Sequence, residues 1–515
     1  MPVYQAGQLN TTALQAPDLY VIIQPPGVAY INGVPTDGLG LVGVGSWGPV
    51  NAPISGIGNN AQAQQAIGGV TFRGRDLATA VAVGVQNNVQ NFVLVRVTDG
   101  TDIAASVALK DTVATPVTGL TLTGLYTGIV GNSITANIAA GTANGTFKLS
   151  IQRAGFTPEV YDNIAGAGAA FWANAVQAVN YGQSGVRGPS QIVVASIGAS
   201  TSAPNVSATY TLAGGTDGAS GVTDLTLVGT DGLTRTGMYA LRKTGVQVGN
   251  LVDCQTPSTW TAQLALGLQE GIYFHTANPA GVSVATSASN LVSAGVDGYG
   301  LMCLVGDWAY WNDTVNGVQR LLSPATFTSA NQASTSPQQS ILNDSIAGVV
   351  ATQRSLQNLP YSEAEIALAA TSRLEVLTLG APAGPIFACR TGRNISSNSA
   401  TNGDNYTRMT NYIAFTVASA FGYVPGKVQT VDLRRNVKGA MDAFFSNLQA
   451  QNMIGNVNNP TAPAWSVQID ANNNPFSQVA LGYMQANVMV TYLSIVRYFL
   501  VNIQGGQSVT VNPVG

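Results

Sequence analysis

The sequence predicts a multidomain protein of α/β and α+β class, with an α/β core, an inserted mainly β domain, a C-terminal α+β domain and extended arms at both ends. A chain of 515 residues is long enough for about two to four domains. Strand and helix patterns alternate in two separate stretches, which is typical of a partly parallel sheet covered on both faces. Between these stretches, short polar–apolar alternations separated by Gly and Asn indicate β structure.

Residues 1–35 are expected to form an N-terminal linker arm. The arm is rich in Gln, Pro, Gly, Thr and Asn and holds one short apolar run, made of Leu19, Tyr20, Val21, Ile22 and Ile23. This run predicts a strand. Because a lone strand cannot satisfy its own backbone groups, we expect it to pair with a sheet of this chain or of another copy.

The α/β core is predicted to be discontinuous, with residues 36–100 and 221–385. In its first part, apolar strands are expected at 39–44 and 91–97, and Asp76 is expected to cap the helix between them. In its second part, the expected helices are 258–270, 285–294, 338–357 and 362–373, and the expected strands are 271–275 and 299–305.

Residues 101–220 are expected to form the inserted, mainly β outer domain, with a single helix at 165–181. The C-terminal α+β domain is predicted for residues 386–503, with long helices at 404–421 and 431–451. Apolar runs at its end predict two strands, 486–493 and 495–503.

The last residues, 504–515, are predicted to be a C-terminal arm. An alternating polar–apolar segment in it is formed by Ser508, Val509, Thr510 and Val511. Like the N-terminal run, it predicts a single strand that lacks a sheet of its own.

Charged residues make up only 9% of the sequence, against roughly 25% in a typical soluble domain. A monomer normally keeps itself soluble with a mixed, charged surface. The deficit therefore favours a protein that hides much of its surface in an assembly. A β-rich surface-layer protein or adhesin is the alternative, but the first residues do not have the pattern of a signal peptide.

The few charges are unevenly distributed. From residue 386 onward there are eight basic and four acidic residues, a net charge of 8 − 4 = +4, while the preceding residues carry 13 − 20 = −7. Arg434, Arg435 and Lys438 cluster at the start of a predicted helix. They form either a solvated helix face or a contact with an acidic partner. Nucleic acid is less favoured because no aromatic residues are interleaved with them.

No pattern in the sequence predicts an active site, a cofactor site or a metal site. Residues 43–48 fit GxGxxG, but the prolines that follow cannot form the helix that a dinucleotide needs. His275 is the only histidine and lies in an apolar strand, where a hydrogen-bonded structural role is favoured over catalysis. Glu363 and Glu365 favour helix capping. We therefore expect no enzyme, no cofactor and no catalytic residue.

The three cysteines, Cys254, Cys303 and Cys389, lie far apart and are expected to be buried as small apolar side chains. The apolar stretch 481–501 is interrupted by polar residues, so no membrane insertion is expected.

Five segments, in order, resemble the contractile tail sheath proteins of bacteriophages. They are GVGSWGPVNAP (43–53), the helix 76–90 followed by NFVLVRV (91–97), GIVGNSITANI (128–138), TLAGGTDG (211–218) and GPIFACRTGRNISSN (384–398) with the helix after it. The last segment resembles the Mu-like branch most. The region 300–345 departs from the family pattern.

The resemblance implies a structural subunit that polymerises as stacked hexameric rings around a tail tube and contracts to drive the tube through the host envelope. The implied partners are other copies of the chain, the tail tube protein, and baseplate and tail terminator proteins. No nucleic acid would be bound directly. The sheath would be part of the virion and would assemble in the host bacterial cytoplasm. A related injection system, pyocin or type VI-like, is the alternative.

In this family, arms of neighbouring subunits add strands to the C-terminal domain. The resemblance thus implies that Leu19–Ile23 and Ser508–Val511 are inter-subunit strands, received by 486–493 and 495–503. It also implies that Arg434, Arg435 and Lys438 face the tube.

Overall fold

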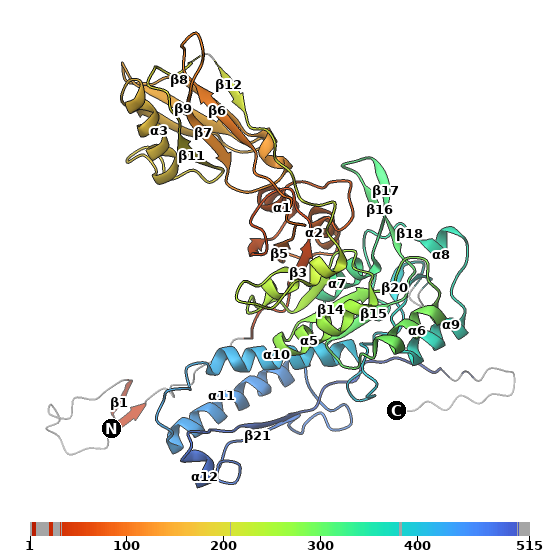
Figure 1. Ribbon diagram of the computed structural model, residues 1–515. Coiled ribbons are helices and arrows are strands. Elements are labelled where there is room, and N and C mark those ends of the chain that lie inside the picture. Colours follow the sequence, from red (N-terminus) through yellow and green to blue (C-terminus); the bar gives the residue numbers. More distant parts are fainter. Residues whose placement is uncertain are drawn as a thin grey trace. The chain divides into compact units, whose positions relative to one another are not determined.

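A computed structural model describes residues 3–6, 20–23, 31, 33–206, 208–380, 384–501 and 503 (Figure 1). The chain divides into two compact units, one of Met1–Val34 with Tyr412–Gly515 and the other Pro35–Asn411. The predicted mixed α/β class is confirmed. The unit boundary falls within helix α10 (Asp404–Phe421), whereas the sequence placed the start of the C-terminal domain at residue 386.

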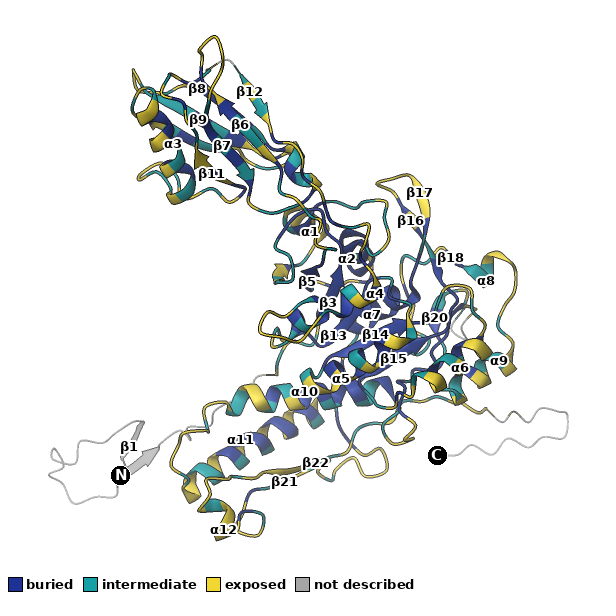
Figure 2. Ribbon diagram, in the orientation of Figure 1, coloured by how far each residue is buried: buried dark blue, intermediate teal, exposed yellow. Residues whose placement is uncertain are grey.

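A six-stranded sheet forms the centre of the larger unit, in the order β15-β14-β13-β3-β5-β4. All neighbours run parallel except β4 and β5, which are antiparallel. The strands are β3 (Gly38–Gly43), β4 (Pro53–Ile57), β5 (Asn91–Arg96), β13 (Val248–Leu251), β14 (Tyr273–Ala277) and β15 (Leu301–Leu304). Figure 2 shows that these strands are almost wholly buried, except the edge strand β4, which is largely exposed.

Helices cover both faces of this sheet, because successive strand side chains point to opposite sides. Leu39 and Leu41 of β3 pack into the cluster that contains Leu77 of α2, while Val42 packs into the one that contains Trp260 of α5. The first cluster includes residues of α1 (Asn60–Ile67), α2 (Leu77–Gln86) and α7 (Pro324–Ser334). The second includes residues of α4 (Asp224–Val228), α5 (Trp260–Glu270), α6 (Val284–Ala294) and α9 (Glu363–Thr371).

The helix predicted at 338–357 is wrong. Within it, only α8 (Gln353–Leu356) is helical. Asn343 and Gly348 have φ values of 58° and 84°, outside the helical region, and the N–H of Val350 donates to the carbonyl of Tyr310 instead of to its own segment. The sequence missed α7, which is buried over its first ten residues although it is rich in Thr, Ser, Asn and Gln.

Smaller elements complete the larger unit near the sheet. The hairpin β16 (Ala309–Asp313) and β17 (Val318–Leu322) pairs with β18 (Ala351–Thr352). The antiparallel pair β19 (Leu377–Leu379) and β20 (Phe387–Cys389) precedes α10. The caps of α2 by Asp76 and of α9 by Ser362 with Glu365 are as the sequence predicts.

The inserted domain contains two antiparallel sheets and one helix, α3 (Ala169–Tyr181). The sheets have the orders β10-β9-β8-β12 and β11-β7-β6. Their strands are β6 (Ser106–Lys110), β7 (Thr118–Gly124), β8 (Thr135–Ala140), β9 (Phe147–Gln152), β10 (Glu159–Ile164), β11 (Val193–Ile197) and β12 (Thr209–Thr211). Asn180 of α3 both donates to and accepts from the backbone of Ala195, so it blocks the free edge of β11.

In the smaller unit, α11 (Val431–Ala450) packs against a two-stranded sheet of β21 (Trp465–Gln468) and β22 (Asn487–Val490). A short helix, α12 (Phe476–Val479), lies between these strands in sequence. The arm contributes β1 (Val3–Ala6) and β2 (Tyr20–Ile23), which pair in parallel.

His275 has the structural role that the sequence favours. Its ring is fully buried in β14, and Nδ1 lies 2.9 Å from Oγ1 of Thr328 on α7. Burial, with the nearby charge of Arg408, lowers the pKa of His275 to about 3, so the ring is neutral at physiological pH. Cys254, Cys303 and Cys389 are buried and free.

We predict that His275→Gln removes part of the protein's sensitivity to acid. The folded pKa lies below the ordinary value of 6.5, so the stabilisation is complete above pH 6.5 and is lost as pH falls toward 3. The native protein should lose roughly 1.4 kcal/mol per pH unit relative to the variant within this window. Urea unfolding at a series of pH values measures this difference, and parallel stability curves would contradict the prediction.

Candidate assembly surfaces and the joints behind them

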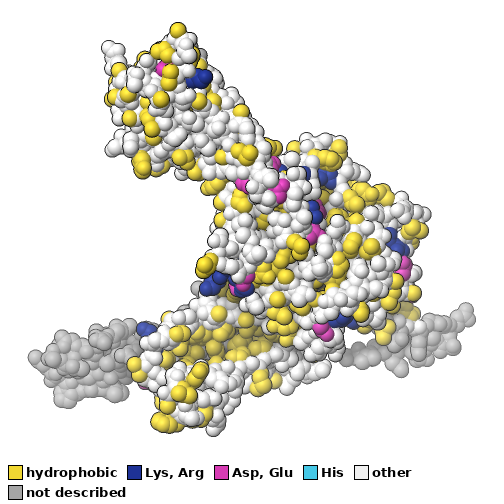
Figure 3. Space-filling view, viewed as in Figure 1, with side chains coloured by type: hydrophobic (Ala, Val, Ile, Leu, Met, Phe, Trp, Pro, Cys, Tyr) yellow, Lys and Arg dark blue, Asp and Glu magenta, His cyan; other side chains and the backbone are white. Residues whose placement is uncertain are grey.

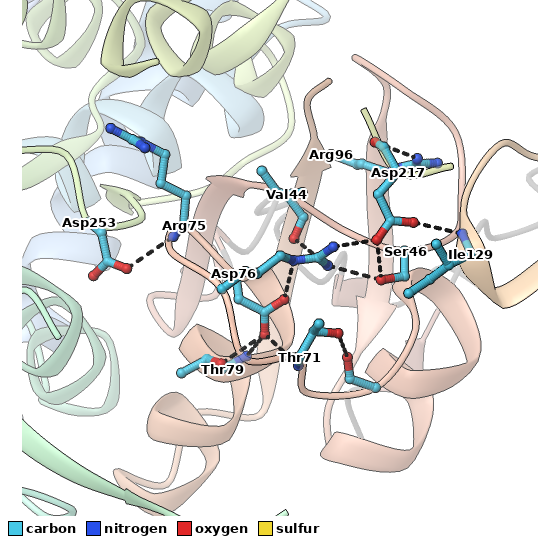
Figure 4. Close-up of polar contacts among 12 residues, drawn as sticks. Val44, Ser46, Thr71, Arg75, Asp76, Thr79, Arg96, Ile129, Asp217 and Asp253 are labelled. Atoms are coloured by element: carbon cyan, nitrogen blue, oxygen red, sulfur yellow. Dashed lines mark hydrogen bonds and ion pairs between the residues drawn. The ribbon is translucent and has the colours of Figure 1, made fainter. Parts of the chain in front are cut away.

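The inserted domain is joined to the core by a buried polar network centred on Asp217 (Figure 4). Asp217 lies in the segment that returns from the inserted domain. Its carboxylate accepts hydrogen bonds from Oγ of Ser46, from the guanidinium of Arg73 and from the backbone N–H of Ile129. One side chain thereby ties the core to the returning segment and to the segment between β7 and β8 of the inserted domain.

Arg96, at the end of β5, also connects the core to the inserted domain. Its side chain is fully buried, and Nη1 lies 2.8 Å from the carbonyl oxygens of both Gly48 and Thr127. Burial lowers the pKa of Arg96, and the charges of Asp102 and Asp217 oppose this effect. Because the guanidinium donates in a fixed planar fork, it sets the spacing between the core loop and the inserted domain.

A second set of buried hydrogen bonds fixes the segment that leads into α10. The carboxylate of Glu375 is fully buried and accepts from the backbone N–H groups of Arg390, Thr391 and Gly392 at 2.7–2.8 Å. Gly392 has a φ of 56°, and a Cβ there would lie 2.7 Å from Oγ of Ser340. The family-like segment ACRTGRN is therefore a loop wrapped around a buried carboxylate.

Arg408, on α10, hydrogen-bonds two segments of the larger unit that are distant from it in sequence. Its Nη2 lies 2.8 Å from the carbonyl oxygen of Thr36 and 3.3 Å from that of Thr335. Only 1% of the residue is exposed, and burial lowers its pKa to about 10, so the charge persists. Arg408 thus holds the entry segment at Thr36 beside the helix that exits.

The sheet of the smaller unit has only two strands. Each of these strands has four residues, and Val488 and Met489 of β22 are both exposed although they point to opposite faces. A two-stranded sheet is marginally stable by itself. Among the described residues, no further strand pairs with β21 or β22, and the chain's own contact at this edge is an isolated bridge between Ile454 and Tyr492, just beyond β22.

Downstream of β22 lies an exposed run of apolar side chains, here called the apolar tail segment. It consists of Val496, Tyr498, Phe499, Leu500, Val501 and Ile503, which are 60–87% exposed. The sequence predicted a strand at 495–503, and this is wrong for the described residues of that range, which form none. A strand needs a partner strand for its backbone groups, and none of the described strands is paired with residues 495–501 and 503.

The three basic residues predicted to face a tube lie on the first turns of α11, and two of them have acidic neighbours. Arg435 lies 3.6 Å from Asp432, and Lys438 lies 2.6 Å from Asp442. After rotation of its amide, Gln429 accepts from Arg434. The cluster is thus partly neutralised within its own helix, which weakens any long-range attraction to an acidic partner.

The predicted arm strands are only partly within the described structure. Tyr20, Val21, Ile22 and Ile23 form β2, which pairs with β1 of the same arm. Leu19 and the run Ser508, Val509, Thr510 and Val511 lie outside the described residues. The inter-subunit role of both runs stays a prediction.

The described residues contain no group of His, Cys, Asp and Glu side chains that could hold a metal ion. None of the helices that the structure describes is long and apolar enough to cross a membrane. Figure 3 shows charged side chains only in small separate groups on the visible face, as the 9% charge content leads one to expect.

The sequence matches no family model and no curated protein. Solved structures do match. The sheath tail protein of Listeria innocua aligns over 84% of this chain and 89% of its own, with a TM-score of 0.59 and 16% identity. The chain has the fold of a sheath tail protein. The sheath tail protein of Desulfitobacterium hafniense aligns over 88% of this chain and 94% of its own, with a TM-score of 0.54 and 17% identity.

The sheath fold also extends to an extracellular contractile injection system. The PVC sheath in its contracted state aligns over 96% of this chain and 99% of its own, with a TM-score of 0.54 and 9% identity. The family resemblance noted in the sequence therefore identified the fold correctly. Placement in the Mu-like branch stays a prediction.

Sequence reasoning found the segments of the sheath fold but missed the side chains that hold them. Asp217 was seen only as part of a Gly-rich domain end, although an acid among glycines is a usable signal for backbone hydrogen bonding. Glu375 and Arg153 carry no local signal, since their partners are distant in sequence.

We predict that Glu375→Gln destabilises the larger unit by about 3 kcal/mol, because the amide replaces a charged acceptor that binds four backbone N–H groups, those of Val376, Arg390, Thr391 and Gly392. The shift in the urea-unfolding transition measures the loss. Glu363→Gln is the matched control: Glu363 is an exposed carboxylate in the first turn of α9. The control should cost less than about 1 kcal/mol. Equal effects of the two substitutions would contradict the conclusion that Glu375 stabilises the unit through its buried backbone hydrogen bonds.

Proposed function

We propose that this chain is the sheath subunit of a contractile tail, polymerising as stacked hexameric rings around an inner tube. One combination of observations carries the proposal: the sheath fold spans nearly the whole chain, and the smaller unit has an incomplete sheet followed by the apolar tail segment. A fold that exposes so much apolar surface is suited to a polymer.

Assembly would proceed by strand exchange between copies. The strand β2 of one copy would add to the edge of the β21–β22 sheet of another, and the apolar tail segment would be covered in the same contact. Each backbone hydrogen bond gained contributes about 0.5–1.5 kcal/mol net, and burial of the apolar side chains adds to this. Such head-to-tail contacts do not close on themselves, so they build a helix of rings.

The tube contact would be made by the basic side of α11, with Arg434, Arg435 and Lys438. Because Asp432 and Asp442 compensate part of this charge, the attraction to an acidic tube would be weak and sensitive to salt. A weak contact suits a sheath that must release the tube as contraction passes. Baseplate and tail terminator proteins would bound the sheath, which would assemble in the host bacterial cytoplasm as part of the virion.

The subunit would work mechanically and not as an enzyme. His275, the single histidine, is buried and neutral. The solved structures that share the fold have the titles of sheath proteins. A sheath in a pyocin, type VI-like or extracellular injection system would use the same subunit chemistry, and the likeness to the PVC sheath favours this second candidate over a surface-layer protein.

Negative-stain electron microscopy of the purified chain tests the assembly proposal directly. We expect tubular polymers with ring-like striations when the protein is concentrated. A chain that stays monodisperse at every concentration and salt level would contradict the proposal.

We predict that deletion of residues 1–25 abolishes these polymers but leaves the larger unit folded, because the arm strand would no longer reach a neighbouring sheet. Sedimentation measures polymerisation, and circular dichroism verifies the fold. The substitution Asn144→Ser, at an exposed turn of the inserted domain, is the control that should polymerise normally. Polymers of normal yield from the deletion variant would exclude strand exchange by this arm.

We further predict that the double substitution Arg434→Glu and Arg435→Glu prevents extended sheath from forming around the tube but permits tubes of contracted type. The reversal turns attraction into repulsion at the tube surface, and it also removes the exposed pair of Arg435 with Asp432, which contributes little to stability. Co-assembly with the tube protein, viewed by electron microscopy, measures this. Unchanged extended assembly would mean that α11 does not hold the tube.

A further inference from the structure

The inserted domain contacts the core at a further point, through the side chain of Arg153. This residue directly follows β9, and its guanidinium extends to the last turn of α1. Nη1 lies 2.9 Å from the carbonyl oxygen of Gln65, and Nη2 lies 3.1 Å from that of Gln64. A cation at these carbonyls in the last turn of α1 also lies at the negative end of the helix dipole.

Two aromatic rings enclose the same guanidinium. It lies 4.4 Å from the ring centre of Phe156, in the turn between β9 and β10, and 5.0 Å from that of Trp47, in the core. Arg153 is only 4% exposed and forms no ion pair with any described residue. A buried cation held by two carbonyls and two rings is a specific contact between domain and core.

The other contacts described above between the inserted domain and the core lie around the two segments that connect them. The outgoing and returning segments are paired by hydrogen bonds between Ile103 and Thr216, beside the network of Asp217. Trp47 packs into the apolar cluster of the inserted domain next to these segments. Contacts gathered around paired connecting segments permit a swinging motion, whereas Arg153 binds a different core element, α1.

Beside Arg153, the domain and the core are separated by a cleft of about 520 Å³. Pro49, Ile54 and Gln65 line it from the core, and Thr157 and Ile192 line it from the inserted domain. The two surfaces are therefore not packed together across this space.

We propose that Arg153, through its contact with α1, fixes the orientation of the inserted domain relative to the core. When this contact breaks, the inserted domain would rotate into the cleft. The arginine is a positioning residue that joins two bodies. The inference depends only on the larger unit and holds whether or not the chain forms a sheath.

Distance measurements between two spin labels test this proposal in the full chain. Labels at Asn144→Cys in the inserted domain and Thr314→Cys in the β16–β17 turn both occupy exposed positions, and the native cysteines are buried. Labelled chains are diluted into excess unlabelled chain, so that distances within one copy dominate. With Arg153 present we expect one narrow distance distribution.

Arg153→Ala should broaden this distance distribution and shift its mean, because the contact with α1 that fixes the inserted domain is lost. Arg153→Lys keeps the charge but cannot donate to both carbonyls as a fork, so it should give a smaller shift in a chain that folds even if the alanine variant does not. Arg187→Ala is the matched control, since Arg187 also lines the cleft but pairs with Glu159 inside the inserted domain. The proposal is overturned if the folded Arg153 variants keep the narrow parental distribution, or if Arg187→Ala broadens it equally.

Discussion

A strand edge without a partner is the constraint on which the rest of this structure depends. Backbone N–H and C=O groups must be paired, and a sheet of two four-residue strands leaves most of its edges open. The chain adds to this an exposed apolar tail segment and an arm that carries a strand of its own. Each feature is unfavourable in an isolated monomer, and the proposed contacts with other copies would resolve all three.

The larger unit differs from the smaller one in the buried charged side chains that connect its segments. Buried Asp217, Arg96, Glu375 and Arg408 each bind backbone groups from segments distant in sequence. Bidentate and charge-assisted hydrogen bonds of this kind fix geometry as well as adding stability. Outside the inserted domain, the larger unit can therefore act as a rigid body, while exchange of strands would be left to the smaller unit and the arm.

The sequence revealed the order of the main elements because their signals are local. Apolar strands such as 91–97, the Asp76 cap and the family-like segments are readable from neighbouring residues. Helix α7 was missed because its buried face carries Thr328 and other polar residues that pair with distant groups such as His275. The false helix at 338–357 has a helical composition, but its backbone hydrogen bonds go to other segments. Side chains that act over long distances, such as Glu375, could not be found without the fold.

A helical reconstruction of the assembled protein by electron cryomicroscopy tests the central claim most directly. The account predicts that residues 20–23 of one copy are hydrogen-bonded as a strand beside the β21–β22 sheet of another copy, with the apolar tail segment covered. A polymer in which every copy keeps both strand edges of that sheet free, and is joined through other surfaces, would contradict it.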